Sequence, residues 1–157
     1  MALILENTNQ VEFHSDLNNL ISPFKEKFKS LNWLVAEQDY LILDSSDSKF
    51  TNKINLDSDF FQFDGHELLD ILEGHNIQFN WGIFCGMTNR LNYIREEDLP
   101  FADGNSRIWS HPDEFFYSNS EIEIICFDSS LTVLKFRDHK IEESWRRVFT
   151  DAKKLEK

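Results

Sequence analysis

The sequence predicts a single α+β domain over residues 1–157, with helices packed on one mixed or mainly antiparallel sheet of about five strands. Three observations support this prediction. A chain of this length usually folds as one domain. Segments with the three-and-four spacing of amphipathic helices are interspersed with short apolar or alternating runs that are typical of strands. Fifteen phenylalanines against five glycines and three prolines indicate an aromatic core with few loose linkers.

The first helix is expected over residues 17–31, where apolar side chains repeat at three and four. Ser15 or Asp16 is placed to cap its start. Pro23 either kinks this helix or occupies the first position of a shorter one. The stretches LNWLVAE and DYLILDS then predict two strands joined by a tight connection around Gln38, as an antiparallel hairpin.

A second helix is expected over DGHELLDILEG, residues 64–74. Asp64 and Glu67 have the spacing of a capping box, and Gly74 suits a left-handed C-terminal position. The segments INL and FFQF before it are candidates for short strands. The next segment, IQFNWGIFCG, alternates over ten residues and contains no charge, which predicts a central strand covered on both faces.

The alternate residues of IQFNWGIFCG form a second parity set, and we ask whether it lines a working surface: Gln78, Asn80, Gly82, Phe84 and Gly86. Gly82 and Gly86 lack side chains, so another backbone or an aromatic ring can come close to them. We expect Asn80 to be hydrogen-bonded, because buried polar side chains nearly always are. The set is therefore expected to fit beneath its neighbours and not to form a catalytic surface.

The C-terminal part follows an irregular segment at residues 87–120, in which HPDEFFYS is at best a short helix. EIEIICFD and LTVLKFR predict a second hairpin about Ser129 and Ser130. A final helix is expected over DHKIEESWRRVFTDAKKLEK, with Asp138 as its N-cap. Its predicted buried stripe consists of Ile141, Trp145, Val148, Ala152 and Leu155.

Negative charge is concentrated in the middle of the chain, whose formal net charge is −12. From Glu37 to Asp128 there are 19 Asp or Glu against five Lys or Arg, whereas the flanks are slightly basic. Such a surface repels DNA and anionic membranes, so neither is an expected partner. A solvated acidic face that only aids solubility is the plain alternative. The first ten residues resemble neither a signal peptide nor a membrane span, which predicts a cytoplasmic protein.

The sequence contains no motif for metal, cofactor or nucleotide binding. His66 and His75 lie nine residues apart, unlike a zinc pair, and DSSDSK lacks the glycine and distal glutamate of a calcium loop. The scattered glycines form no phosphate-binding loop. Cys85 and Cys126 are expected to be buried thiols, not a disulfide or a nucleophile. We therefore expect no cofactor, no metal and no catalytic residue.

The acidic residues that flank the second helix and the irregular segment are the candidate binding surface for a protein partner. Glu67, Asp70 and Glu73 stand three apart and share one side of the helix. Like charges at this spacing repel, and a basic partner would compensate that cost. The acidic candidates are Asp57, Asp59, Asp64, Glu67, Asp70, Glu73, Glu96, Glu97, Asp98 and Asp103.

Aromatic residues near these acids are candidates for interface anchors. Tyr93 and Trp109 lie in the irregular segment, and Phe60 and Phe61 precede the acidic helix. The alternative is that they form a small additional core beneath a long loop.

In size, charge and aromatic content the chain resembles the small acidic cytosolic immunity proteins that bacteria encode beside toxins. The likeness extends loosely over the whole chain, through the FDGHELLDILEG helix, the IQFNWGIFCG strand, and the closing hairpin with ESWRRVF. It implies a stoichiometric inhibitor that covers the basic active site of a cognate toxin, often a nuclease, encoded by an adjacent gene. It assigns no role to any specific residue.

Two other functions stay open at this point. A small-ligand protein or enzyme could use a pocket involving Arg90, Arg95, Arg107 and His111, since arginines in an acidic segment can converge on a carboxylate or phosphate. Internal salt bridges would equally explain those arginines. A homo-oligomeric structural subunit is the third alternative.

Overall fold

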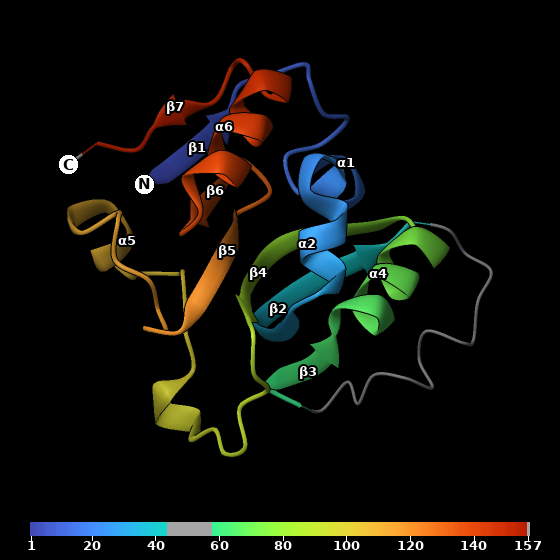
Figure 1. The fold of residues 1–157 in the computed structure, drawn as a ribbon, viewed down its shortest axis with the longest axis vertical. Helices are drawn as coiled ribbons and strands as arrows, with labels where there is room; N and C mark the ends of the chain where they lie inside the picture. Colours follow the sequence, from blue (N-terminus) through green and yellow to red (C-terminus); the bar gives the residue numbers. More distant parts are fainter. Residues whose placement is uncertain (44–57, 157) are drawn as a thin grey trace.

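The computed structural model describes residues 1–43 and 58–156, which are built around one antiparallel sheet. Its strand order is β3-β2-β4-β5-β6-β1-β7 (Figure 1). The α+β class and the antiparallel pairing are confirmed, but the described residues form seven strands and not about five. The strands are β1 (Ala2–Glu6), β2 (Asn32–Ile42), β3 (Phe60–Asp64), β4 (Ile77–Met87), β5 (Ser120–Phe127), β6 (Leu131–Phe136) and β7 (Lys153–Lys154).

The hairpin predicted around Gln38 is wrong, because residues 32–42 form the single long strand β2. The last two residues of DYLILDS lie outside the described residues. The first half of β2 pairs with β3, and β4 pairs with β2 along nearly its whole length. The polar residues that suggested a turn instead produce a register shift between Ala36 and Asp39, where Glu37 has a φ of +49°. A β-bulge of this kind bends a strand without reversing it. The segment INL lies outside the described residues, whereas FFQF forms β3 as expected.

Four of the helices, α1 (Leu17–Ile21), α2 (Lys25–Lys29), α4 (Gly65–Gly74) and α6 (His139–Val148), cover one face of the sheet. Pro23 divides the first helical region into α1, a 3₁₀ turn η1 (Ser22–Phe24) and α2, and Asp16 caps α1. The helix α4 begins with the predicted capping box of Asp64 and Glu67. Gly74 is its last residue and does not have a positive φ, so that detail of the prediction is wrong. In Figure 1, α2 and α4 lie side by side in front of the sheet.

The last helix, α6 (His139–Val148), is shorter than predicted. It begins at the expected cap, Asp138, but the chain then leaves the helix, and Lys153–Lys154 pair with β1 as β7. Trp145 is buried as expected, whereas Val148 is 50% exposed and Phe149 is buried in its place. No helix in the described part of the chain is long and apolar enough to cross a membrane.

The sheet is buried on both faces. The helical face is packed with aromatic rings, including Phe28 stacked on Trp33 with ring centroids 4.4 Å apart. The opposite face is covered by residues 88–119, which contain the 3₁₀ turn η2 (Glu96–Asp98) and the short helix α5 (Arg107–Ser110). The irregular segment thus acts as the second covering layer, which explains why β4 and β5 are apolar on both sides.

Strand β4 lies inside the sheet between β2 and β5, as predicted. The alternation does not hold throughout, because Ile77 and Phe79 pack on the helical side whereas Trp81, Ile83 and Cys85 pack on the loop side. The change occurs beside the register shift in β2.

The small and polar residues of β4 are structural. A Cβ atom on Gly86 would lie 2.7 Å from the Trp33 ring, and one on Gly82 would lie 3.1 Å from the Phe84 ring. Asn80 Oδ1 accepts a 2.6 Å hydrogen bond from Ser129 Oγ, which ties β4 to the β5–β6 turn. These contacts agree with the expectation that this parity set packs beneath its neighbours.

Candidate functional site

The predicted acidic surface is divided between the two faces of the sheet. Glu67, Asp70 and Glu73 are exposed on α4, on the helical side. Glu67 is engaged in the capping box, and Glu73 pairs with Lys25 on the surface. Asp59 and Asp103 lie on the opposite side, so the acids form no continuous face with α4. Asp57 lies outside the described residues.

Asp59 and Asp103 line a hollow of about 410 Å³, which we call the acidic hollow. Its lining residues are Glu37, Gln38, Asp39, Ser58, Asp59, Trp81 and Asp103. Four of these seven carry a carboxylate, and no lysine, arginine or histidine lines the hollow within the described residues. An array of carboxylates around an indole ring attracts cationic groups by charge and by cation–π contact.

The bulge in β2 positions the acidic side chains that line the hollow. The carboxylate of Glu37 accepts hydrogen bonds from the backbone N–H groups of Ala102 and Asp103, the latter at 3.2 Å. Gln38 Nε2 donates to the carbonyl of Ser58 at 2.8 Å. These contacts fasten the two segments that carry Asp103 and Asp59 to β2. Both aspartates remain exposed, and neither forms an ion pair within the described residues.

A second cavity, of about 240 Å³, lies within the irregular segment, and we call it the loop pocket. Its apolar walls are Leu99, Pro100, Phe101, Ile108, Phe115 and Phe116. Its polar lining consists of Glu97, Asp98, Asn105, Arg107, His111, Glu114 and Lys135. Positive and negative groups are nearly balanced, in contrast to the acidic hollow.

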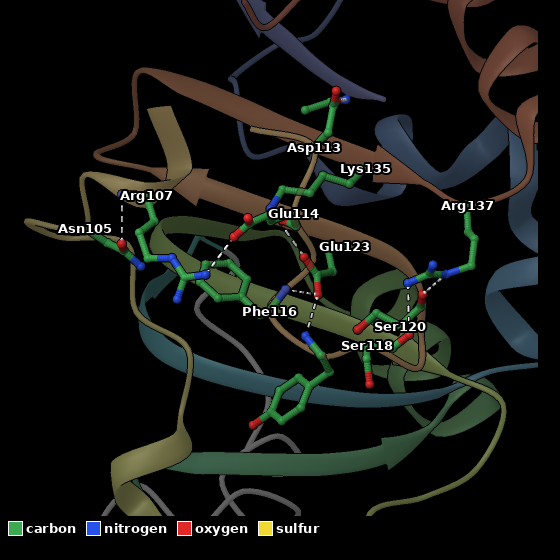
Figure 2. A network of polar contacts seen from close by, with 12 residues as sticks. Asn105, Arg107, Asp113, Glu114, Phe116, Ser118, Ser120, Glu123, Lys135 and Arg137 are labelled. Atoms are coloured by element: carbon green, nitrogen blue, oxygen red, sulfur yellow. Dashed lines mark hydrogen bonds and ion pairs between the residues drawn. The ribbon is translucent and has the colours of Figure 1, made fainter. Parts of the chain in front are cut away.

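A buried ion pair holds one wall of the loop pocket to the sheet (Figure 2). Glu123 of β5 and Lys135 of β6 are almost fully buried, with 3.5 Å between Oε2 and Nζ. Glu123 Oε1 accepts hydrogen bonds from Phe116 N at 2.8 Å and Tyr117 N at 3.3 Å. The Lys135 ammonium donates to the carbonyl of Glu114. The pair therefore fixes residues 114–117 at the sheet surface.

Burial shifts the pKa values of Glu123 and of the nearby Cys85 thiol. Desolvation raises the pKa of Glu123, although Lys135 and the two backbone amides oppose the shift. Desolvation also raises the pKa of the Cys85 thiol well above its ordinary value, and the negative charge of Glu123 adds to this. Cys85 is thus a buried, protonated thiol, which does not suit a nucleophile.

The four residues of the alternative Arg/His pocket do not converge. Arg107 and His111 line the loop pocket, as predicted. Arg95 instead pairs with Glu97 and Asp98 at 2.7 and 2.6 Å. Arg90 donates to the carbonyl of Gln62 at 3.4 Å, beside β3.

The aromatic residues predicted as interface anchors also lie in different environments. Tyr93 is 80% exposed, which suits a surface anchor. Trp109 packs edge-on against Phe127 with centroids 5.2 Å apart, so it belongs to the core beneath the irregular segment. Phe60 and Phe61 pack against opposite faces of the sheet. Glu96 is exposed in η2 beside the two acids that Arg95 holds.

Within the described residues, no group of three or more His, Cys, Asp or Glu side chains is arranged to hold a metal ion. No family model, no curated protein and no solved structure matches the chain.

Sequence reasoning missed Glu37, Asp39 and Trp81 in the hollow, and Lys135 and Glu123 at the loop pocket. Lys135 and Glu123 could have been found, because each is a charged residue that interrupts an apolar run within its strand. The hollow could not have been found, because it depends on a bulge in β2 whose polar residues also suit a turn.

Proposed function

We propose that this chain is a protein-binding inhibitor, of the immunity type, which neutralises a basic bacterial toxin through the acidic hollow. The observation that carries the proposal is the lining of the hollow: four carboxylates and Trp81 with no cationic side chain among the described residues. The proposed binding surface is therefore on the loop side of the sheet and not on α4.

The chemistry of the hollow supports a basic partner. Asp59 and Asp103 are exposed and free of ion pairs in the described part of the chain, so a lysine or arginine can approach without displacing an internal partner. By contrast, Glu73, Glu97, Asp98 and Glu114 each already have an internal cation. Complementary charge of this kind also speeds association.

The arrangement of the hollow supports binding rather than catalysis. Glu37 and Asp39 are held by hydrogen bonds to the backbone or to Asn80, which fixes their carboxylates before a partner arrives. Preorganised charges lose little conformational entropy on binding. The indole of Trp81 adds a surface over which an arginine side chain can lie.

The experiment is to co-express the chain with the product of the adjacent gene and to measure their affinity at low and at physiological salt. We expect a stoichiometric complex whose affinity falls by about tenfold or more as the Debye length shortens toward 8 Å. Absence of a complex at both salt concentrations would refute that protein as the partner. A salt-independent affinity would refute the acidic hollow as the contact surface.

A further inference from the structure

The loop pocket is lined by a buried cation, Lys135, whose ammonium makes one hydrogen bond within the described residues. The Lys135 ammonium carries three N–H donors. Within the described residues it has a hydrogen bond to the Glu114 carbonyl and an ion-pair contact with Glu123, and it lies 4.9 Å from the centroid of the Phe116 ring. Its side chain is only 2% exposed, yet it lines the pocket.

The acids of the pocket differ from Lys135 in both exposure and partners. Glu97, Asp98 and Glu114 are about half exposed or more, and each is paired with an arginine at 2.6–2.7 Å. Water screens such exposed charges strongly, whereas a buried charge acts through a lower dielectric. Lys135 is itself paired with the buried Glu123, so the pair adds little net field, and what it offers an anionic group is the N–H donor capacity of an ammonium that water does not screen.

The rest of the pocket suits an apolar body. Its walls are the side chains of Leu99, Pro100, Phe101, Ile108, Phe115 and Phe116. A volume of about 240 Å³ equals the share of roughly eight water molecules in the liquid, each about 30 Å³. A single aromatic ring with a short acidic group fits within this volume.

The geometry points to a binding site for a small carboxylate with an apolar body. The carboxylate would accept a hydrogen bond from the buried Lys135 (Figure 2), and Arg107 and His111, which are exposed, line the same pocket. The site is separate from the acidic hollow and does not depend on the proposed protein partner.

Three probes with the same ring and different head groups test this site: benzoate, benzyl alcohol and benzylamine. Each is titrated into nitrogen-15-labelled protein, and amide shifts are followed by NMR. We expect benzoate to bind at least about tenfold more tightly than either other probe, because only it accepts a charge-assisted hydrogen bond from Lys135. The largest shifts should fall on Ile108 and Phe116. Benzylamine binding as tightly as benzoate, absence of binding, or shifts centred elsewhere would overturn the proposal.

Variants separate the role of Lys135 from general charge. In the double variant Glu123→Gln/Lys135→Met, the buried pair is replaced by uncharged groups of similar volume, and the preference for benzoate should fall to within about twofold. Arg107→Gln should weaken benzoate by only a few-fold, because that guanidinium is 75% exposed. Arg147→Gln, on α6, is the matched control and should leave the affinity for benzoate unchanged. Retained preference in the folded double variant would overturn the proposal. If that variant does not fold, the head-group comparison in the wild-type protein decides.

Discussion

Gly86 stands where the indole ring of Trp33 crosses strand β4. A Cβ atom there would lie 2.7 Å from the ring, and the ring is held by a 2.9 Å hydrogen bond from Nε1 to the Phe28 carbonyl. We expect Gly86→Ala to lower the free energy of unfolding by about 1–3 kcal/mol, because a fixed buried ring must move. Urea unfolding measures this.

Gly74→Ala is the matched control, because a Cβ atom at Gly74 meets nothing within 4 Å. It should leave the stability unchanged or raise it by up to about 1 kcal/mol, since alanine is the better helix former. An equal loss in the two variants would contradict the close contact between Gly86 and Trp33.

The raised pKa of Glu123 predicts how stability depends on pH. A carboxyl group whose pKa is raised on folding binds its proton more tightly in the folded state, so the folded state loses stability as pH rises. The affected range begins near the ordinary value of 4.5 and ends at the folded pKa. We therefore expect the stability of the wild type, relative to Glu123→Gln, to fall across this range.

Urea titrations of both proteins at a series of pH values measure this difference. Glu123→Gln serves as the reference for the wild type, because the two proteins share all other titrating groups. A relative stability that rises with pH would mean that the folded state favours the charged carboxylate, which would contradict the effect of burial.

At the level of elements, Glu37 links the bulge of β2 to the irregular segment. Its carboxylate accepts hydrogen bonds from the backbone N–H groups of Ala102 and Asp103. We expect Glu37→Gln to speed hydrogen exchange at these two amides by roughly tenfold, because a charge-assisted hydrogen bond is lost. Asp39→Asn, which removes a neighbouring charge without touching these amides, should leave their exchange unchanged. Equal acceleration in both variants would mean that general charge, not the bond to Glu37, holds the segment.

The elements that sequence could predict are those specified by local chemistry. The capping box of α4, the break at Pro23 and the turn at Ser129 follow from neighbouring residues. The continuity of β2 could not be predicted in this way, because polar residues such as Glu37, Gln38 and Asp39 occur both in turns and in β-bulges. Strand β7 was missed because its two lysines become a strand only through pairing with β1.

At the scale of the whole molecule, the sheet divides the negative charge into two groups with different surroundings. The acids of α4 lie over the helical layer, and the acids of the hollow lie beside the irregular segment. The sequence shows how many acids the middle of the chain contains but not how they are grouped, because residues 37, 59 and 103 come together through tertiary contacts alone. The segment that was hardest to interpret from sequence proved to line both cavities.

The measurement that tests the central claim most directly is the affinity of two charge-reversal variants for the co-expressed partner. Asp59→Lys/Asp103→Lys alters the acidic hollow, and Asp70→Lys/Glu73→Lys makes the same change in net charge on α4. We predict that the first variant weakens binding by about 100-fold or more, because like charges then face the basic partner, while the second changes affinity only by the few-fold that overall charge dictates. Loss of binding in the α4 variant with full binding in the hollow variant would contradict the account.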